Sequence, residues 1–385
     1  MKKVIISHTN YKTFGGEDAN YLTESKFLIE NYKVINLTFN NYEKLNIYDF
    51  ISFFNNSNIE SNRKLKNILK EQEVDLIYFH NLWFKGNLGL LKIAKNNNLK
   101  IVIKIHNFRY MCASTFSSNK HAEKNNVCNA CNFKGRGKFK FNKYYENSYT
   151  RSFFVIWHTK KFLKILKKYP SQIFIVSDLH KKYIEKLNID PSRITKFYNP
   201  IIKPKKISEY NPSSNYVVFA GRITEEKGIY ELIDVWKQFD NKGIKLKIIG
   251  KYSLDNINLK TIFTSNTNIE LLGELSLEDT ITQINKARAL IMPTKLFEGQ
   301  PRVLCEASIM GVPSIFPNSG SIVEFFPDNY ILKYKQFDYR DLLFKLSFLH
   351  DEERLLKISK IVSNFSSEQL SNDFLMEKFN AVFYE

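Results

Sequence analysis

Cysteines and long apolar runs are scarce in this sequence. Four cysteines in 385 residues are too few for a disulfide scaffold. No stretch reaches the ~18 to 20 apolar residues that a membrane-spanning helix needs. The opening MKKVIISHTN holds only a short apolar run, well below that of a signal peptide. We therefore expect a cytoplasmic protein with reduced cysteines, whose membrane contacts are peripheral.

Acidic residues are outnumbered by basic ones. The chain has 57 Lys and Arg against 39 Asp and Glu, which gives a formal net charge of +18. Such an excess predicts attraction to an anion, whether nucleic acid, a phosphate-bearing metabolite or an acidic membrane surface. With 43% hydrophobic and 25% charged residues, the composition is that of a folded protein rather than a disordered one. The placement of the charges must decide between these partners.

Short apolar runs alternate with longer stretches of helical periodicity in two separate parts of the chain. This alternation is typical of parallel sheets with helices on both faces. Between the two parts, Asn199–Asn215 contains three prolines and few core-forming residues, as a linker does. We predict an α/β protein of two doubly wound Rossmann-like domains, residues 1–199 and 214–365, joined by a linker at 200–213. The runs are KVIIS, VDLIYFH, KIVIKIHN and IFIVS in the first part, and YVVFAG, IKLKIIG, IELLG, ALIMPT and PSIF in the second.

Residues 366–385 are expected to form a C-terminal helix that packs back toward the N-terminal domain. In open α/β sheets, ligands bind beyond the carboxyl ends of the strands. Two such domains facing one another would leave a central cleft lined by strand-to-helix loops. Candidate functional residues are therefore sought in those loops.

The first loop of the second domain reads GRITEEKG and carries Arg222 and Lys227 between two glycines. A guanidinium can grip a diphosphate through two oxygens, an ammonium adds a point charge, and the following helix adds backbone donors. Either residue alone could belong to an exposed basic loop. Their shared position at the end of a strand favours binding of a nucleotide diphosphate without a metal.

The stretch FEGQPRVLCEASIMGVP carries two carboxylates in mostly apolar surroundings. Proline and glycine at its ends predict a short helix over Pro301–Met310. Glu298 lies just before this helix and Glu306 about two turns further along, on the same side. Carboxylates accept hydrogen bonds from sugar hydroxyls, so the pair could hold the two ends of an elongated ligand. Alternatively, Glu298 is a favourable charge at a helix start and Glu306 a solvated residue, although a carboxylate between VLC and ASIM needs a partner.

Five motifs in order resemble the retaining GT-B glycosyltransferases of family 4. GRITEEKG and FEGQPRVLCEASIMGVP are similar to the donor-binding half of that family, with Glu298 and Glu306 at its Glu-x7-Glu positions. In the first half, FGGEDANYL resembles the family's Gly-Gly phosphate loop, HNLW its second loop and IKIHNFRYMC its active-site loop. The resemblance spans nearly the whole chain and implies a GT-B fold.

The resemblance also implies roles for individual residues. Glu298 would contact the transferred sugar, and His106 matches the histidine that touches that sugar. Glu306 would bind the ribose hydroxyls. The other donor-binding residues would be Gly15, Gly16, Arg222, Lys227 and Gly299: the first two glycines let the backbone approach the donor closely, and the two cations neutralise its diphosphate.

Asp-x-Asp, the metal-binding pattern of the other large glycosyltransferase class, does not occur in the chain. Cationic side chains would then supply the charge compensation as the diphosphate leaves, so we expect no metal site and no cofactor, the nucleotide-sugar being a substrate. One departure concerns the strand ending at Gly250, where the family has another glycine and this chain has Lys251 and Tyr252. That departure leaves the contacts to the nucleotide base open.

A group of cysteines follows His106. Cys128 and Cys131 have Cys-x2-Cys spacing, with Cys112 and His121 upstream, which could make a structural zinc site. A subset of the family carries four cysteines here, and the fourth would fall at Tyr144. The spacing fits no compact zinc module well, so we expect no bound metal.

Basic residues concentrate between Lys134 and Lys168, where eleven Lys or Arg accompany a single acidic residue. The segment KKFLKILKKY places its lysines on one helical face and its apolar residues largely on another, as in a helix that lies on an anionic membrane. Alternatively, the apolar face packs into the N-terminal domain. This packing would still allow the lysines to contact lipid headgroups. The lysines are 160, 161, 164, 167 and 168, and the apolar residues are Phe162, Ile165, Leu166 and Tyr169.

The pattern as a whole predicts a hexosyltransferase-type glycosyltransferase, cytoplasmic and peripheral on the inner face of the membrane. It would move a sugar from a nucleoside-diphosphate-sugar to a surface polysaccharide or a lipid-linked oligosaccharide, with retention of configuration. A GT-B-shaped epimerase of the same donors is the alternative enzyme. A nucleic-acid-binding protein is the alternative from another class. It is disfavoured because the basic segment keeps its aromatics away from its lysines.

Overall fold

The computed structural model describes residues 1–12, 15–41, 47–108, 110, 143, 145, 148–201, 207–251 and 268–384. These residues form two compact units. The first unit holds the described residues up to Pro200 together with those from Asn372 onward, and the second unit holds Ile201–Ser371. The expected C-terminal helix over residues 366–385 is divided between the units. Residues 366–369 are the end of the last helix of the second unit, and the residues from Asn372 onward belong to the first unit.

The first unit is built on a six-stranded parallel sheet of order β2-β1-β3-β4-β5-β6. Its central strands β3, β4 and β5 are mostly apolar and buried along almost their whole length, as expected of strands covered by helices on both faces. The order reverses between β1 and β3, so the loops after these two strands meet at the switch point of the sheet. The strands are β1 Lys3–Asn10, β2 Lys33–Asn40, β3 Leu76–Phe79, β4 Lys100–Ile105, β5 Gln172–Ile175 and β6 Ile194–Lys196.

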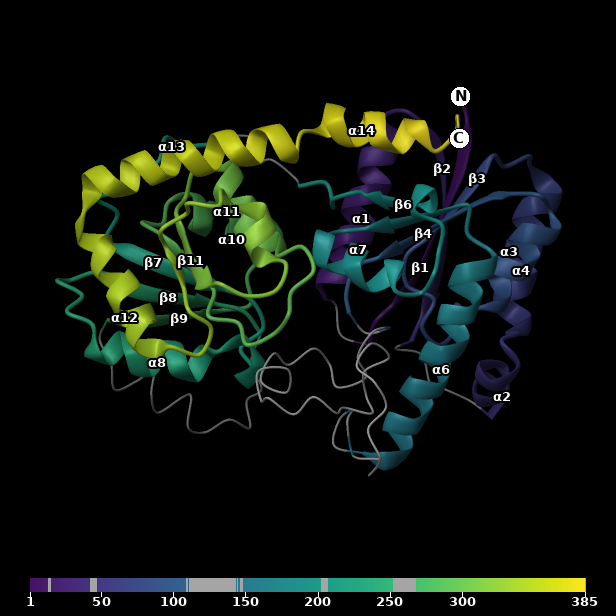
Figure 1. Ribbon diagram of the computed structural model, residues 1–385, viewed down its shortest axis with the longest axis horizontal. Helices are drawn as coiled ribbons and strands as arrows, with labels where there is room; N and C mark the ends of the chain where they lie inside the picture. The colour runs from purple at the N-terminus through teal and green to yellow at the C-terminus, as the bar shows by residue number, and fades with distance from the viewer. Residues whose placement is uncertain are drawn as a thin grey trace. The chain divides into compact units, whose positions relative to one another are not determined.

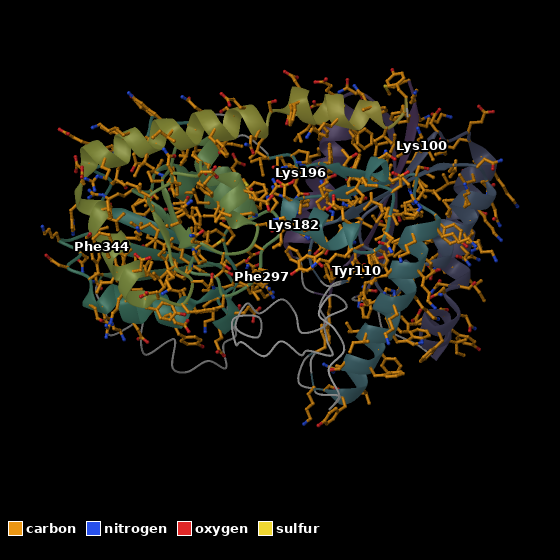
Figure 2. All side chains as sticks on the ribbon, viewed as in Figure 1. Lys100, Tyr110, Lys182, Lys196, Phe297 and Phe344 are labelled. Carbon is orange, nitrogen blue, oxygen red and sulfur yellow. The ribbon has the colours of Figure 1, made fainter. Side chains whose placement is uncertain are left out.

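Helices cover both faces of this sheet (Figure 1). In that view α3, α4 and α6 lie on one side of the first unit and α1 and α7 on the other. The C-terminal helix α14 packs on the same unit: the side chain of Lys100, labelled in Figure 2, donates to the carbonyl oxygen of Val382. The helices are α1 Gly16–Ile29, α2 Ile47–Asn55, α3 Ile59–Glu71, α4 Gly89–Asn96, α6 Tyr149–Lys168, α7 Asp178–Glu185 and α14 Asn372–Ala381.

The second unit holds another six-stranded parallel sheet, of order β12-β11-β10-β7-β8-β9. Here the order reverses between β7 and β10, and the loops after those strands meet at the switch point. The strands are β7 Tyr216–Ala220, β8 Lys245–Ile249, β9 Ile269–Gly273, β10 Leu290–Ile291, β11 Ser314–Pro317 and β12 Lys333–Tyr334; the helices are α8 Ile229–Gln238, α10 Leu277–Asn285, α11 Arg302–Ile309, α12 Tyr339–Ser347 and α13 Glu352–Gln369.

Helix α6 contains the lysine-rich segment, and two apolar residues of that segment face inward. Phe162 and Leu166 are buried in the first unit, because they belong to the stripe that covers the sheet. The alternative in which the apolar face packs into the unit is therefore confirmed for Phe162 and Leu166. Contact of the lysines with lipid headgroups stays a prediction. Lys160 and Lys164 on the other face are exposed. No helix in the described part of the chain is long and apolar enough to cross a bilayer.

Candidate functional site

The loops after β7 and β10 are held against each other by a glycine. Gly228 has a φ of +73°, and a Cβ built on it would lie 2.0 Å from the carbonyl oxygen of Pro293. Any larger residue would separate the two loops, so only glycine permits both this backbone conformation and the close approach. One turn of 3-10 helix, Glu225–Lys227, precedes Gly228 and directs Lys227 toward the second loop.

Lys227 and Glu298 meet at this switch point. The Lys227 Nζ atom lies 2.5 Å from Glu298 Oε1, and the two side chains are 18% and 19% exposed. The hydroxyl of Thr294 donates to the same carboxylate oxygen at 3.0 Å. A cation and a carboxylate from two loops thus share a partly buried site at the position where doubly wound sheets bind ligands.

The loop that carries Glu298 is fixed by its neighbours. The hydroxyl of Ser321 donates to the backbone carbonyl of Glu298 at 2.8 Å. Phe297, labelled in Figure 2, lies against Gly320, where a Cβ would come within 2.8 Å of the phenylalanine ring. Gly299 follows Glu298 directly and leads into α11. The carboxylate of Glu298 is therefore presented by a constrained loop.

Arg222 lies on the same loop as Lys227 but is far more exposed. Its Nη2 atom is 3.3 Å from Glu226 Oε1, and the two side chains are 57% and 43% exposed. Exposed ion pairs contribute little stability because water and salt screen them. The guanidinium can therefore leave Glu226 for a more highly charged anion at small cost.

Glu306 is buried, 4% exposed, and is paired within its own helix. The Nε atom of Arg302 lies 2.7 Å from Glu306 Oε1. Burial raises the pKa of Glu306, and the charge of Arg302 opposes that rise. The alternative of a solvated helix residue is wrong for Glu306. The required partner is Arg302, which sequence analysis missed although its spacing of four residues is a helical pairing signal.

In the first unit, Gly15 and Gly16 begin α1 at the end of the β1 loop. The amide of Gly15 donates to Asp18 Oδ2 at 2.8 Å. A Cβ on Gly16 would meet no atom within 4 Å, so open space lies beside this glycine. The other carboxylate oxygen of Asp18 pairs with His8 Nε2 at 2.8 Å and thereby ties the helix start to β1.

His106 follows β4 and is held by a second histidine. Its Nε2 atom lies 2.7 Å from His80 Nδ1, and the two rings stack with centroids 4.9 Å apart. Burial lowers the pKa of both histidines well below 6.5. Both rings are therefore neutral near pH 7, and one donates to the other. Sequence analysis singled out His106 and gave His80 no role of its own.

A buried ion pair lies beneath these histidines. Lys104 Nζ is 2.6 Å from Glu24 Oε1, and the hydroxyl of Tyr78 donates to Glu24 Oε2 at 2.5 Å. Burial raises the pKa of Glu24 and lowers that of Lys104 to about 8, each shift being opposed by the partner. Sequence analysis missed this pair, whose only signal is a lysine inside the apolar run KIVIKIHN.

Glu24, His80 and His106 lie close enough together to be weighed as metal ligands. Both oxygens of Glu24 are engaged, because Lys104 pairs with Oε1 and Tyr78 donates to Oε2. His80 Nδ1 and His106 Nε2 bond each other, whereas His80 Nε2 and His106 Nδ1 are buried without a hydrogen-bond partner among the described residues. A cation beside the carboxylate also opposes the binding of another cation. We therefore interpret this group as a hydrogen-bonded network.

The candidate residues divide between the units. Gly15, Gly16 and His106 lie in the first unit, whereas Arg222, Lys227, Glu298, Gly299 and Glu306 lie in the second. Within the second unit the structure joins Lys227 to Glu298 directly and pairs Arg222 and Glu306 with other residues. Lys251 is exposed at the end of β8. The possible zinc ligands Cys112, His121, Cys128 and Cys131, as well as Tyr144 and Tyr252, lie outside the described residues.

Residues 201–361 match the family model described as glycosyl transferases group 1. The second unit carries a group 1 glycosyltransferase domain. The chain is also 27% identical to CapM of Staphylococcus aureus, a capsular polysaccharide biosynthesis glycosyltransferase, over 213 residues that make up 50% of this chain and 53% of CapM. The chain thus spans about half the length of this relative.

Solved structures with similar folds cover the whole chain. Anabaena HepE, solved in complex with UDP and glucose, matches with a TM-score of 0.67 at 13% identity over 100% of both chains. Sucrose-phosphate synthase of Thermosynechococcus elongatus matches with a TM-score of 0.71 at 11% identity, over 100% of this chain and 98% of that one. At such identities the likeness shows the fold alone. The prediction of a GT-B fold with two Rossmann-like domains is confirmed.

Proposed function

We propose that this protein is a family 4 glycosyltransferase that moves a sugar from a nucleoside-diphosphate-sugar to an acceptor with retention of configuration. The observation that carries the proposal is the 2.5 Å pair of Lys227 and Glu298 at the switch point of the second sheet. The oxygens of a bound diphosphate compete with Glu298 for the ammonium. The carboxylate is then free to accept hydrogen bonds from the hydroxyls of the transferred sugar.

Cations take the place of a metal in this proposal. Arg222 leaves its exposed partner and joins Lys227 on the diphosphate, which carries more negative charge as the bond to the sugar breaks. Glu298 stabilises the positive charge that develops on the sugar at the same time. Glu306 binds the ribose and His106 contacts the sugar, and no divalent metal is needed.

The acceptor is a growing surface polysaccharide or a lipid-linked oligosaccharide. Support comes from the capsular polysaccharide role in the name of CapM. UDP is the first nucleotide to test, because HepE was solved with UDP. The epimerase alternative is not favoured, since the matched domain and CapM are glycosyltransferases by name.

The test incubates the full chain with UDP-sugars, with and without an oligosaccharide acceptor and with and without excess EDTA. We expect acceptor-dependent release of UDP that EDTA does not abolish, and NMR should show that the new linkage keeps the donor's anomeric configuration. Inversion would contradict retention, and loss of transfer in EDTA would contradict the cationic account. Conversion of the donor without acceptor would favour the epimerase.

A further inference from the structure

Helix α2 leaves a row of apolar side chains exposed on the first unit. Tyr48, Ile51 and Phe54 are 71%, 50% and 42% exposed, and residues three apart lie on the same side of a helix. The opposite side is anchored: Phe53 is buried and stacks on the rings of Phe84 and His158. The exposed row is therefore held in place by a packed helix.

Helix α6 extends this apolar row. The ring of Phe54 lies 5.1 Å from that of Trp157 and 5.6 Å from that of Phe154. Phe153 and Tyr149, near the beginning of α6, are 53% and 52% exposed. Two helices far apart in the sequence thus form one apolar surface.

The exposed charged residues of these two helices are all basic. Lys160 and Lys164 are exposed on α6. Lys161 Nζ lies 3.5 Å from the centroid of the Trp157 ring and donates to the carbonyl of Phe54 at 2.6 Å. The sequence from Ser148 to Lys168 contains no acidic residue, and the one acidic residue of α2, Asp49, is buried. We call Tyr48, Ile51, Phe54, Tyr149, Phe153, Trp157, Lys160, Lys161 and Lys164 the aromatic-basic face.

We propose that the aromatic-basic face docks on an anionic lipid bilayer. Aromatic and aliphatic side chains enter the boundary between headgroups and acyl chains, while lysines pair with lipid phosphates. The apolar contact comes from α2 and the first half of α6, since Phe162 and Leu166 are buried. This inference does not depend on the proposed sugar transfer.

A bilayer fits this face better than a nucleic acid does. Bases stack on aromatic rings whose flat faces are free. Here the Phe54 ring meets those of Trp157 and Phe154 at interplanar angles of 57° and 71°, and Lys161 covers a face of Trp157. These rings pack on one another and on a lysine instead of forming a flat stacking platform, and lipid accepts such a surface without a specific geometry.

The test sediments the full chain with vesicles of phosphatidylcholine alone or mixed with phosphatidylglycerol. One variant combines Ile51→Ser with Phe54→Ser, and a second combines Lys160→Glu with Lys164→Glu. The matched control combines Lys357→Glu with Lys360→Glu, two exposed lysines on α13. Thermal unfolding of each variant verifies that it is folded. Because sedimentation measures vesicle binding alone, the result does not depend on whether the protein transfers sugar.

We expect binding to the anionic vesicles only, unchanged in the control. The lysine variant should bind on the order of thirtyfold more weakly, from about 1 kcal/mol per lysine near an anionic surface, and the apolar variant should also bind more weakly. Equal binding by control and variants would overturn the proposal. Failure of the unaltered protein to bind anionic vesicles would also overturn the proposal. So would binding of the protein to single-stranded RNA instead of vesicles, if the same variants abolished that RNA binding.

Discussion

Glu298 and Glu306 share a motif but have different surroundings. Glu298 is bonded to a lysine of another loop and remains partly exposed, whereas Glu306 is buried and bonded to an arginine of its own helix. A carboxylate beside the reacting sugar stabilises the transition state more than the ground state. A buried carboxylate that holds a ribose acts equally in both states, so it affects binding.

Replacing Glu298 with Gln should separate these roles. The variant keeps the size of the side chain but loses its charge, so single-turnover transfer should fall by on the order of a hundredfold. Affinity for the nucleoside diphosphate should not fall, because Lys227 loses the carboxylate that competes for it. The comparison variant is Glu306→Gln. It should weaken donor binding, measured by calorimetry, more than it slows sugar transfer within the bound complex. Normal turnover by Glu298→Gln would contradict the assignment.

At the scale of elements, the Lys104–Glu24 pair joins β4 to α1, and Tyr78 adds β3. Removing one member of a buried pair leaves an uncompensated charge. Lys104→Met should therefore lower the free energy of unfolding by about 3–5 kcal/mol. Adding Glu24→Gln should recover much of this loss, because the charge disappears and the amide oxygen still accepts from Tyr78.

Urea unfolding of these variants gives the measurement. The control is Lys64→Met, which breaks the exposed pair of Lys64 with Glu60, 2.8 Å apart on α3. That change should cost less than about 1 kcal/mol. If Lys104→Met cost no more than the control, or if the double variant were no more stable than the single one, the pair would not stabilise the first unit in this way.

Elements with a local signal could be predicted from the sequence, and contacts between distant residues could not. The buried strand β3 is a continuous apolar run and β4 is mostly apolar, and α11 begins and ends within one residue of the predicted helix. The edge strand β2, KVINLTFN, was missed because it is only partly buried and its apolar residues are interrupted. Lys104 and Glu24 are 80 residues apart in the sequence, so no spacing rule connects them.

At the scale of the whole molecule, the two units share an architecture but differ in their order of strands. The second sheet places its switch point between β7 and β10, where Lys227 and Glu298 lie. The first sheet has its switch point between β1 and β3, beside Gly15 and His80. The sequence indicated strand-to-helix loops as the site, and only the order of strands shows which loops are neighbours.

The central claim is that a nucleoside diphosphate binds at the switch point of the second sheet. Amide hydrogen exchange of the full chain, with and without UDP, GDP or ADP, tests it most directly. We predict that at least one of these nucleotides slows exchange in residues 221–228 and 292–300, because binding opposes local opening of both loops. Unchanged exchange in these two loops with all three nucleotides, or protection confined to other segments, would contradict the account.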